Sequence, residues 1–254
     1  MILNNSLSYC NAKAVQGRNF NNKIWNAFRL VKGWTVDDTI AQPEASAIAV
    51  KWFKMQLDKT IAEVDDSFSK YRLSEAMMAV YKLFWDEFSS WYLEMVKPGY
   101  QQPIDKATYE ATLGFFDALL RLLHPFMPFI TEELWQALEP RKEGESLMVA
   151  QMPEIAVIDS AYLDAFEIVK EIVGGVRTIR LQKNIPNKDA LELQIVGEHN
   201  EAFNAVIAKM CNLSSISKVE EKAAGAVSFL VRTTEYAVPL GNLINVEEEL
   251  AKLQ

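Results

Sequence analysis

The sequence predicts a mainly α-helical protein, with a helical bundle in residues 1–145 and a small α+β domain in residues 161–240. Apolar residues recur at three- and four-residue steps through the first part, which is the period of amphipathic helices. After a linker with weak periodicity in residues 146–160, short alternating segments typical of strands appear. A chain of 254 residues, of which 50% are hydrophobic, can bury the core that this fold requires.

The first predicted helix runs from about Asn11 to Gly33, after a loose polar lead-in over residues 1–11. Glycine is a favourable helix end because it adopts the left-handed conformation without strain. At about 100° per residue, five apolar residues fall on one side and predict a stripe that packs into the core. These residues are Phe20, Ile24, Ala27, Phe28 and Val31.

Three further long helices and one short helix complete the predicted bundle. A polar connection in residues 34–42 leads to them, and Pro43 suits the first turn of the next helix. The expected helices cover residues 44–69, 73–96, 104–123 and 130–138. Ser74 and Thr131 are the expected caps of the third and the last helix. Consecutive amphipathic helices with short links predict an up-and-down bundle.

The second part begins with a helix that contains Gly174 and Gly175, each costing about 1 kcal/mol relative to alanine. The expected elements are a helix at 161–182, a strand at 190–196, a helix at 200–211 and strands at 215–220, 226–232 and 235–240. Residues 241–254 begin a polar helix with neither a cap nor a glycine at its end. We therefore expect the chain to be cut short within that helix.

The first helix carries an isolated positive charge. Five cations lie between Lys13 and Lys32, and residues 1–32 contain no acid. The whole chain has a formal net charge of −8, so the remainder carries −13. A cationic helix on an acidic protein indicates a surface that faces a polyanion.

The side of this helix opposite the apolar stripe has the side chains that RNA recognition uses. Arginine and lysine suit phosphates, asparagine donates to and accepts from base edges, and tryptophan offers a stacking face. The candidates are Arg18, Asn19, Asn22, Lys23, Trp25, Asn26 and Arg29. The alternative interpretation is the ordinary polar face of a helix on a soluble protein.

A second basic patch lies between Glu171 and Asp189, again without an intervening acid. It contains Arg177, Arg180, Lys183 and Lys188. Arg177 and Arg180 are three residues apart and are expected to share a helix face. The alternative is an ordinary helix C-terminus, where the helix dipole favours basic residues.

The sequence shows no catalytic site. It lacks a P-loop, a GxGxxG fingerprint, a nucleophile elbow and an HExxH motif. Its two histidines and two cysteines have no metal-site spacing, so we expect neither a metal nor a cofactor. We expect a cytoplasmic monomer with no membrane or DNA partner, because the sequence has no signal peptide, no spanning segment and no disulfide framework.

Three helical segments form a set of motifs: GRNFNNKIWNAFRLV (17–31), WDEFSSWYLEMVKP (85–98) and LLRLLHPFMPFITEELWQAL (119–138). In this order and spacing they resemble the anticodon-binding domain of the class I aminoacyl-tRNA synthetases for valine, isoleucine and leucine. The tail VPLGNLINVEEELAKL (238–253) resembles the entry into the coiled-coil arm of the valine enzymes. The isoleucine enzymes commonly carry a cysteine-rich zinc module at this point, and this chain has no such cysteines.

The resemblance implies that the bundle receives the anticodon stem-loop of a tRNA, here a valine isoacceptor, and that the first helix contacts the loop. Many members place an aromatic residue after the basic residue that matches Arg29, and here Leu30 follows. The candidate RNA-binding residues are therefore Arg18, Asn19, Asn22, Lys23, Trp25, Asn26, Arg29, Leu30, Lys32, Arg177, Arg180 and Lys183.

The parent enzyme of such a region charges tRNA with valine, using ATP and magnesium. The HIGH-like and KMSKS-like signatures of the nucleotide-binding fold, and the editing domain, are missing here, so this chain alone is expected to be inactive. The same region of an isoleucine or leucine enzyme, or a helical protein-interaction module that binds no RNA, are the alternatives.

Overall fold

The computed structural model describes residues 2–156 and 158–241. The chain folds into two compact units, Met1–Ile158 and Asp159–Gln254. The predicted helix of the tail lies outside the described residues, apart from Gly241. We describe each unit by itself.

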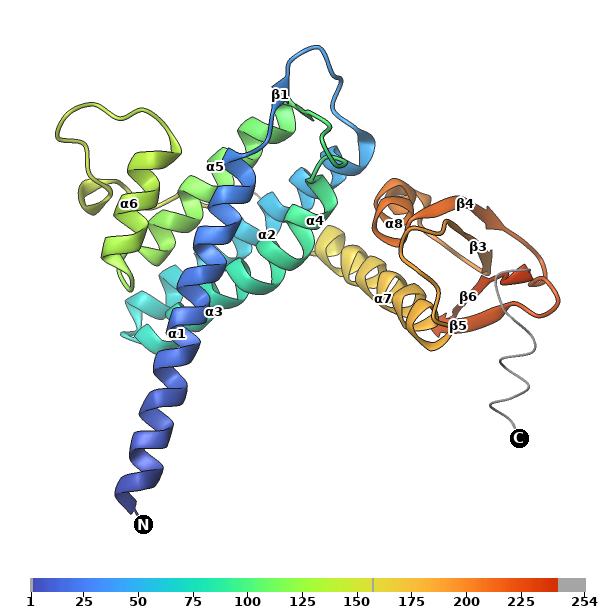
Figure 1. Ribbon diagram of the computed structural model, residues 1–254, viewed down its shortest axis with the longest axis horizontal. Helices are drawn as coiled ribbons and strands as arrows, with labels where there is room; N and C mark the ends of the chain where they lie inside the picture. Colours follow the sequence, from blue (N-terminus) through green and yellow to red (C-terminus); the bar gives the residue numbers. More distant parts are fainter. Residues whose placement is uncertain (1, 157, 242–254) are drawn as a thin grey trace. The chain divides into compact units, whose positions relative to one another are not determined.

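Unit 1 is built from long helices that run up and down beside one another, as Figure 1 shows. The predicted mainly helical fold class is confirmed. Its elements are α1 (Ile2–Lys32), β1 (Val36–Asp37), α2 (Glu44–Ser69), α3 (Leu73–Lys82), η1 (Leu83–Tyr92), α4 (Leu93–Val96), β2 (Ile104–Asp105), α5 (Lys106–Leu123), α6 (Pro128–Leu138) and the short 3₁₀ turn η2 (Leu147–Val149).

Helix α1 buries the stripe that the sequence predicts. Phe20, Ile24 and Val31 are almost fully inaccessible, and Ala27 and Phe28 are also buried. The predicted loose lead-in is wrong, because the helix already begins at Ile2. Residues 2–11 contain neither proline nor glycine, so nothing in the local sequence interrupts the backbone hydrogen-bond ladder.

Two short strands that the sequence analysis missed join the connections of unit 1. Strand β1 pairs in parallel with β2, with Val36 opposite Ile104. Because Ile104 and Asp105 belong to β2, helix α5 begins two residues later than expected. Asp105 is its N-cap, and its carboxylate accepts a hydrogen bond from the amide of Thr108 at 2.8 Å.

The predicted third helix, residues 73–96, is helical over its whole length, but it changes from α-helix to π-helix and back. Its middle, η1, is a π-helix, in which Ser90 Oγ donates to the carbonyl of Trp85 at 2.9 Å. The widened turns direct Phe84, Phe88 and Tyr92 into the centre of the bundle, where each is fully buried. Rings from α2 and α5 pack against them at centroid distances of 5.0 to 6.0 Å.

Two predicted caps are wrong. Helix α3 begins after Arg72, with no side-chain cap, so Ser74 lies inside it. Helix α6 begins at Pro128, whose missing N–H costs nothing in a first turn. Thr131 instead shares a 2.8 Å hydrogen bond with His124 Nδ1.

Unit 2 is a four-stranded sheet with α7 and α8 packed on it (Figure 1). The strand order is β4-β3-β6-β5, with β3 and β4 parallel and the other pairs antiparallel. The elements are α7 (Ser160–Gln182), β3 (Leu191–Val196), η3 (Glu201–Phe203), α8 (Asn204–Cys211), β4 (Leu213–Lys218), β5 (Val227–Val231) and β6 (Thr234–Val238).

The glycine pair of α7 has a packing reason that the sequence did not reveal. A Cβ added at Gly175 would overlap the ring of Phe229 on β5, whereas one added at Gly174 would meet nothing within 4 Å. Only a residue without a side chain allows this strand to approach α7 so closely.

Candidate nucleic-acid interface

The polar face of α1 presents most of the predicted residues to solvent. Arg18, Asn19, Asn22, Asn26 and Arg29 are all exposed. Within the described part of the chain, neither arginine forms an ion pair or a side-chain hydrogen bond. Both guanidinium groups can therefore reach an external anion without breaking an internal contact.

Lys23 is held more closely than its exposed neighbours. It is half-buried, and its Nζ lies 5.1 Å from the centroid of the Trp85 ring on η1. A cation over an aromatic face is attracted by the ring quadrupole, so the ammonium has a preferred position at the edge of the polar face. Sequence reasoning did not single out Trp85. The available signal was its position outside the apolar stripe that Val80, Phe84 and Phe88 form.

Trp25 and Leu30 supply exposed apolar surface beside the charged residues. Each is 42% exposed, which is high for a large apolar side chain on a helix that packs into a core. The Trp25 ring leans on Phe28 with a centroid distance of 6.1 Å. This contact leaves part of the indole available for stacking. Leu30 has no ring to stack with.

Lys32 already has an internal partner. Its Nζ donates a 2.9 Å hydrogen bond to the carbonyl of Leu138, at the C-terminal end of α6. A cation at this position satisfies a terminal carbonyl and complements the helix dipole. Lys32 thus joins α1 to α6, and this contact competes with any external anion.

The second predicted patch does not form as expected, because Arg180 is buried. Its side chain is only 5% exposed, and its two terminal nitrogens donate to three backbone carbonyls. The acceptors are Pro186 at 2.9 Å, Cys211 at 2.8 Å and Asn212 at 3.3 Å. The expectation that Arg180 faces RNA is wrong. Its guanidinium instead fastens the end of α7 to the turn between α8 and β4.

Arg177 and Lys183 lie on the outside of the same helix end, so Arg177 and Arg180 do not share an exposed face. Arg177 is exposed and Lys183 is half-buried. Burial raises the pKa of the nearby Cys211 thiol to about 12, although the charges of Arg177 and Arg180 oppose that shift. The thiol therefore stays protonated at neutral pH and is not a nucleophile.

The described residues contain no group of three or more potential metal ligands. None of the helices in the same part of the chain is long and apolar enough to cross a membrane. His124 and His199 both have structural partners. The two nitrogens of His199 lie 3.0 Å from Tyr236 Oη and 2.6 Å from Asn204 Oδ1.

A helical bundle with an exposed Arg/Asn/Trp face is an arrangement suited to single-stranded RNA. Residues 50–195 match the model of the family described as the anticodon-binding domain of tRNA ligase. The match covers more than half of the chain, so the chain belongs to this family. The resemblance seen in the motifs is thereby confirmed.

The chain is similar to valine–tRNA ligases in particular. It is 96% identical over 250 residues to the enzyme of Parabacteroides distasonis, 68% over 251 residues to that of Phocaeicola vulgatus and 61% over 253 residues to that of Bacteroides thetaiotaomicron. Each comparison covers 98% of this chain but 29% of the relative. The chain therefore spans about 29% of the length of the curated relatives that it matches.

Proposed function

We propose that this chain is the anticodon-recognition region of a valine–tRNA ligase and that the exposed face of α1 contacts the anticodon loop of valine tRNA. The observation that carries the proposal is the pair of uncommitted guanidinium groups, Arg18 and Arg29, on a helix whose opposite side is locked into the core. Membership of the anticodon-binding family, whose model matches residues 50–195, supports the first part of this proposal.

In the proposed mechanism each type of side chain has a different role in binding the anticodon loop. Arg18, Arg29 and Lys23 neutralise phosphates of the loop, which supplies affinity and its dependence on salt. Asn19, Asn22 and Asn26 offer paired donors and acceptors to unstacked base edges, which supplies discrimination. Trp25 stacks on one splayed base. The α1 scaffold holds these groups in place because its buried stripe fixes the helix against α5, α6 and η1.

The catalytic step belongs to the remainder of the proposed ligase. In this proposal the chain binds no ATP, magnesium or valine and turns over none of them. Its contribution is to position the tRNA. An assay of valine activation with this chain alone is expected to give no product. Product formation would contradict this part of the proposal.

The central test compares two double variants in filter-binding titrations with valine tRNA. Changing Arg18 and Arg29 to Ala is expected to weaken binding about tenfold. The negative slope of log affinity against log salt concentration is expected to become shallower by about 1 to 1.5. The control changes two other exposed cations to Ala, Lys59 on α2 and Lys70 at its C-cap. It removes the same charge from a helix that is not among the main packing partners of α1.

An unchanged affinity and salt slope in the Arg18/Arg29 variant would exclude this face as the RNA contact. Equal losses in both double variants would indicate non-specific attraction to charge. Changing Asn22 and Asn26 to Ala is expected to reduce the preference for valine tRNA over an unrelated tRNA while leaving the salt slope unchanged, because amides read bases without neutralising phosphates.

A further inference from the structure

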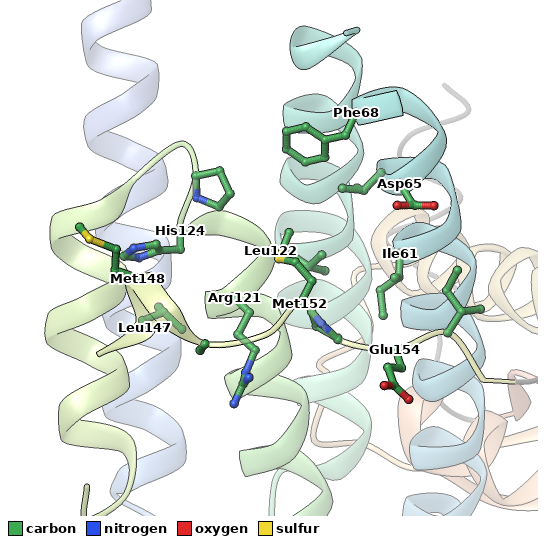
Figure 2. A pocket seen from close by; sticks show the side chains of 15 residues that line it. Ile61, Asp65, Phe68, Arg121, Leu122, His124, Leu147, Met148, Met152 and Glu154 are labelled. Carbon is green, nitrogen blue, oxygen red and sulfur yellow. The ribbon is translucent and has the colours of Figure 1, made fainter. Parts of the chain in front are cut away.

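Unit 1 contains a cavity that the proposed RNA face does not use. It has a volume of about 680 Å³ and lies between the C-terminal half of α2, the end of α5 and residues 147–155 (Figure 2). This volume lies within the range of pockets that hold small organic ligands. The residues that line it all belong to unit 1.

The walls of the cavity are mainly apolar. Ile61, Val64 and Phe68 of α2 form one wall, and Met148 and Met152 of the segment after α6 form part of another. Met148 is 75% exposed and Met152 is 46% exposed, although both are large apolar side chains. Methionine is flexible and polarisable, so such a wall adapts to the shape of an apolar guest.

The charged groups that line the cavity differ in whether they already have a partner within the protein. Arg121 lines it, but Nε donates to Asp117 at 2.6 Å and Nη1 donates to the carbonyl of Gln151 at 2.8 Å. His124 is engaged with Thr131 through Nδ1. The guanidinium of Arg121 is therefore already paired with a carboxylate that does not line the cavity, although Asp117 also pairs with Arg141 at 3.1 Å.

Asp65 and Glu154 are the two acidic side chains at the cavity. Both are exposed, and neither forms an ion pair or hydrogen bond with the described residues. Figure 2 shows them on one side of the cavity, with His124 and Met148 on the opposite side. Two carboxylates beside an apolar wall favour a guest that carries a positive charge on a hydrocarbon body.

We propose that this cavity binds small apolar organic cations, such as a primary amine carried on an aromatic or aliphatic body of about ten to twenty non-hydrogen atoms. The body contacts Phe68, Met148 and Met152, and the ammonium lies beside Asp65 and Glu154. This inference does not depend on the RNA-binding proposal, because none of these residues belongs to the α1 face.

The test uses three probes of nearly equal size: 4-phenylbutylamine, 4-phenylbutanol and 4-phenylbutyrate. They are titrated into the full chain labelled with ¹³C at the methionine methyls, and NMR follows the nine methionines. The amine is expected to shift the Met148 and Met152 resonances. The buried Met95, which does not line the cavity, is expected to stay unchanged. The alcohol is expected to bind about twofold to fivefold more weakly than the amine, as the loss of exposed charge pairing implies, and the carboxylate more weakly still.

Three variants make the test specific. Changing Asp65 to Asn together with Glu154 to Gln is expected to remove the preference for the amine over the alcohol. The matched control, Glu63→Gln with Glu143→Gln, neutralises two exposed acids outside the cavity and is expected to keep that preference. Changing Ala150, which lines the cavity, to Phe is expected to block all three probes.

Equal affinity of the amine and the carboxylate, or probe binding without movement of Met148 and Met152, would overturn the proposal. So would an amine preference that survives the loss of both carboxylates. If the Ala150 variant fails to fold, the Asp65/Glu154 variant still tests the proposal. Both of its substitutions are on exposed side chains and are expected to leave the fold intact.

Discussion

Helix α1 and the end of helix α7 show the same sequence signal with different structural outcomes. Both are helical, basic and free of acids over the cationic stretch. On α1, Arg18 and Arg29 remain exposed and uncommitted. On α7, Arg180 is buried and hydrogen-bonded to three carbonyls. A basic run therefore stays available to an external anion only where no neighbouring loop supplies acceptors for its guanidinium groups.

The physical reason lies in the carbonyl groups at the turns. After α7, the chain bends back through residues 183–190, and the α8–β4 turn brings Asn212, at a φ of 49°, close to the same point. At these turns the carbonyls of Pro186 and Asn212 each accept one backbone N–H, from Asp189 and Leu191, and can accept a second hydrogen bond. A single planar guanidinium satisfies several of them at once.

The largest expected effect comes from changing Arg180 to Ala. Removing the side chain takes away the donor of the Cys211 carbonyl and one of the two donors of the Pro186 and Asn212 carbonyls, which keep the amides of Asp189 and Leu191. We expect unit 2 to lose about 3 kcal/mol of unfolding free energy. All six tryptophans lie in unit 1. Hydrogen exchange of the β3 and β6 amides therefore measures unit 2, while tryptophan fluorescence follows unit 1.

Arg18→Ala is the matched control, and its effect on stability is expected to stay within about 0.5 kcal/mol because the side chain is exposed. If the Arg180 variant were as stable as the Arg18 variant, the structural role assigned to Arg180 would be wrong. Arg180→Lys is expected to recover little, because a single ammonium cannot reproduce the planar fork of the guanidinium.

The second expected effect compares the two adjacent glycines of α7. Gly174→Ala is expected to raise stability by up to about 1 kcal/mol, since the new methyl meets open space and alanine favours helix. Gly175→Ala is expected to lower it by about 1 to 3 kcal/mol, because the Phe229 ring must move. Hydrogen exchange of unit 2 gives both values. Equal effects of the two substitutions would show that the ring moves aside without cost.

The third expected effect concerns Glu132 of α6, which holds the segment after that helix. Its carboxylate accepts hydrogen bonds from the amide of Leu147 at 2.9 Å, from Ser146 Oγ at 3.1 Å and from Gln136 Nε2 at 2.9 Å. Burial raises the pKa of Glu132, but these hydrogen bonds and the charge of His124 oppose it, and the net shift is downward. A lowered folded-state pKa stabilises the protein at neutral pH, and this contribution is lost as the pH falls through the acid range.

We therefore expect Glu132→Gln to cost unit 1 about 1 kcal/mol at about pH 7 and almost nothing in acid below the lowered pKa of Glu132, where the wild-type carboxylate is also protonated. Urea unfolding followed by tryptophan fluorescence measures both values. A difference that persists unchanged into acid would contradict the assignment of the effect to ionised Glu132.

The smallest expected effect tests whether unit 2 adds to RNA binding. With Arg180 buried, changing Arg177 and Lys183 to Ala is expected to weaken binding of valine tRNA by only about twofold, against about tenfold for Arg18 and Arg29. The same filter-binding titration measures both. A loss as large as that of the α1 variant would assign unit 2 an equal part in holding the tRNA.

Several features could be predicted because they depend on local sequence alone. The buried stripe of α1, the helical bundle and the order of helix and strand in unit 2 follow from periodicity, which reports which side of an element faces a core. The exposed polar side of α1 follows from the same pattern. The family followed from motifs that lie on these helices.

Other features depend on residues that are distant in sequence, and no local pattern reports them. The pairing of Val36 with Ile104 needs two connections to meet. The burial of Arg180 needs the carbonyls of Cys211 and Asn212, and the glycine at 175 needs the ring of Phe229.

The first helix illustrates both sides. Its sequence determined which residues could face RNA. Its tertiary contacts decided that Lys23 and Lys32 are partly committed to Trp85 and Leu138, while Arg18 and Arg29 remain free within the described part of the chain. The sequence determines the chemistry of a side chain. Whether that side chain can contact an external ligand depends on which groups the tertiary structure places beside it.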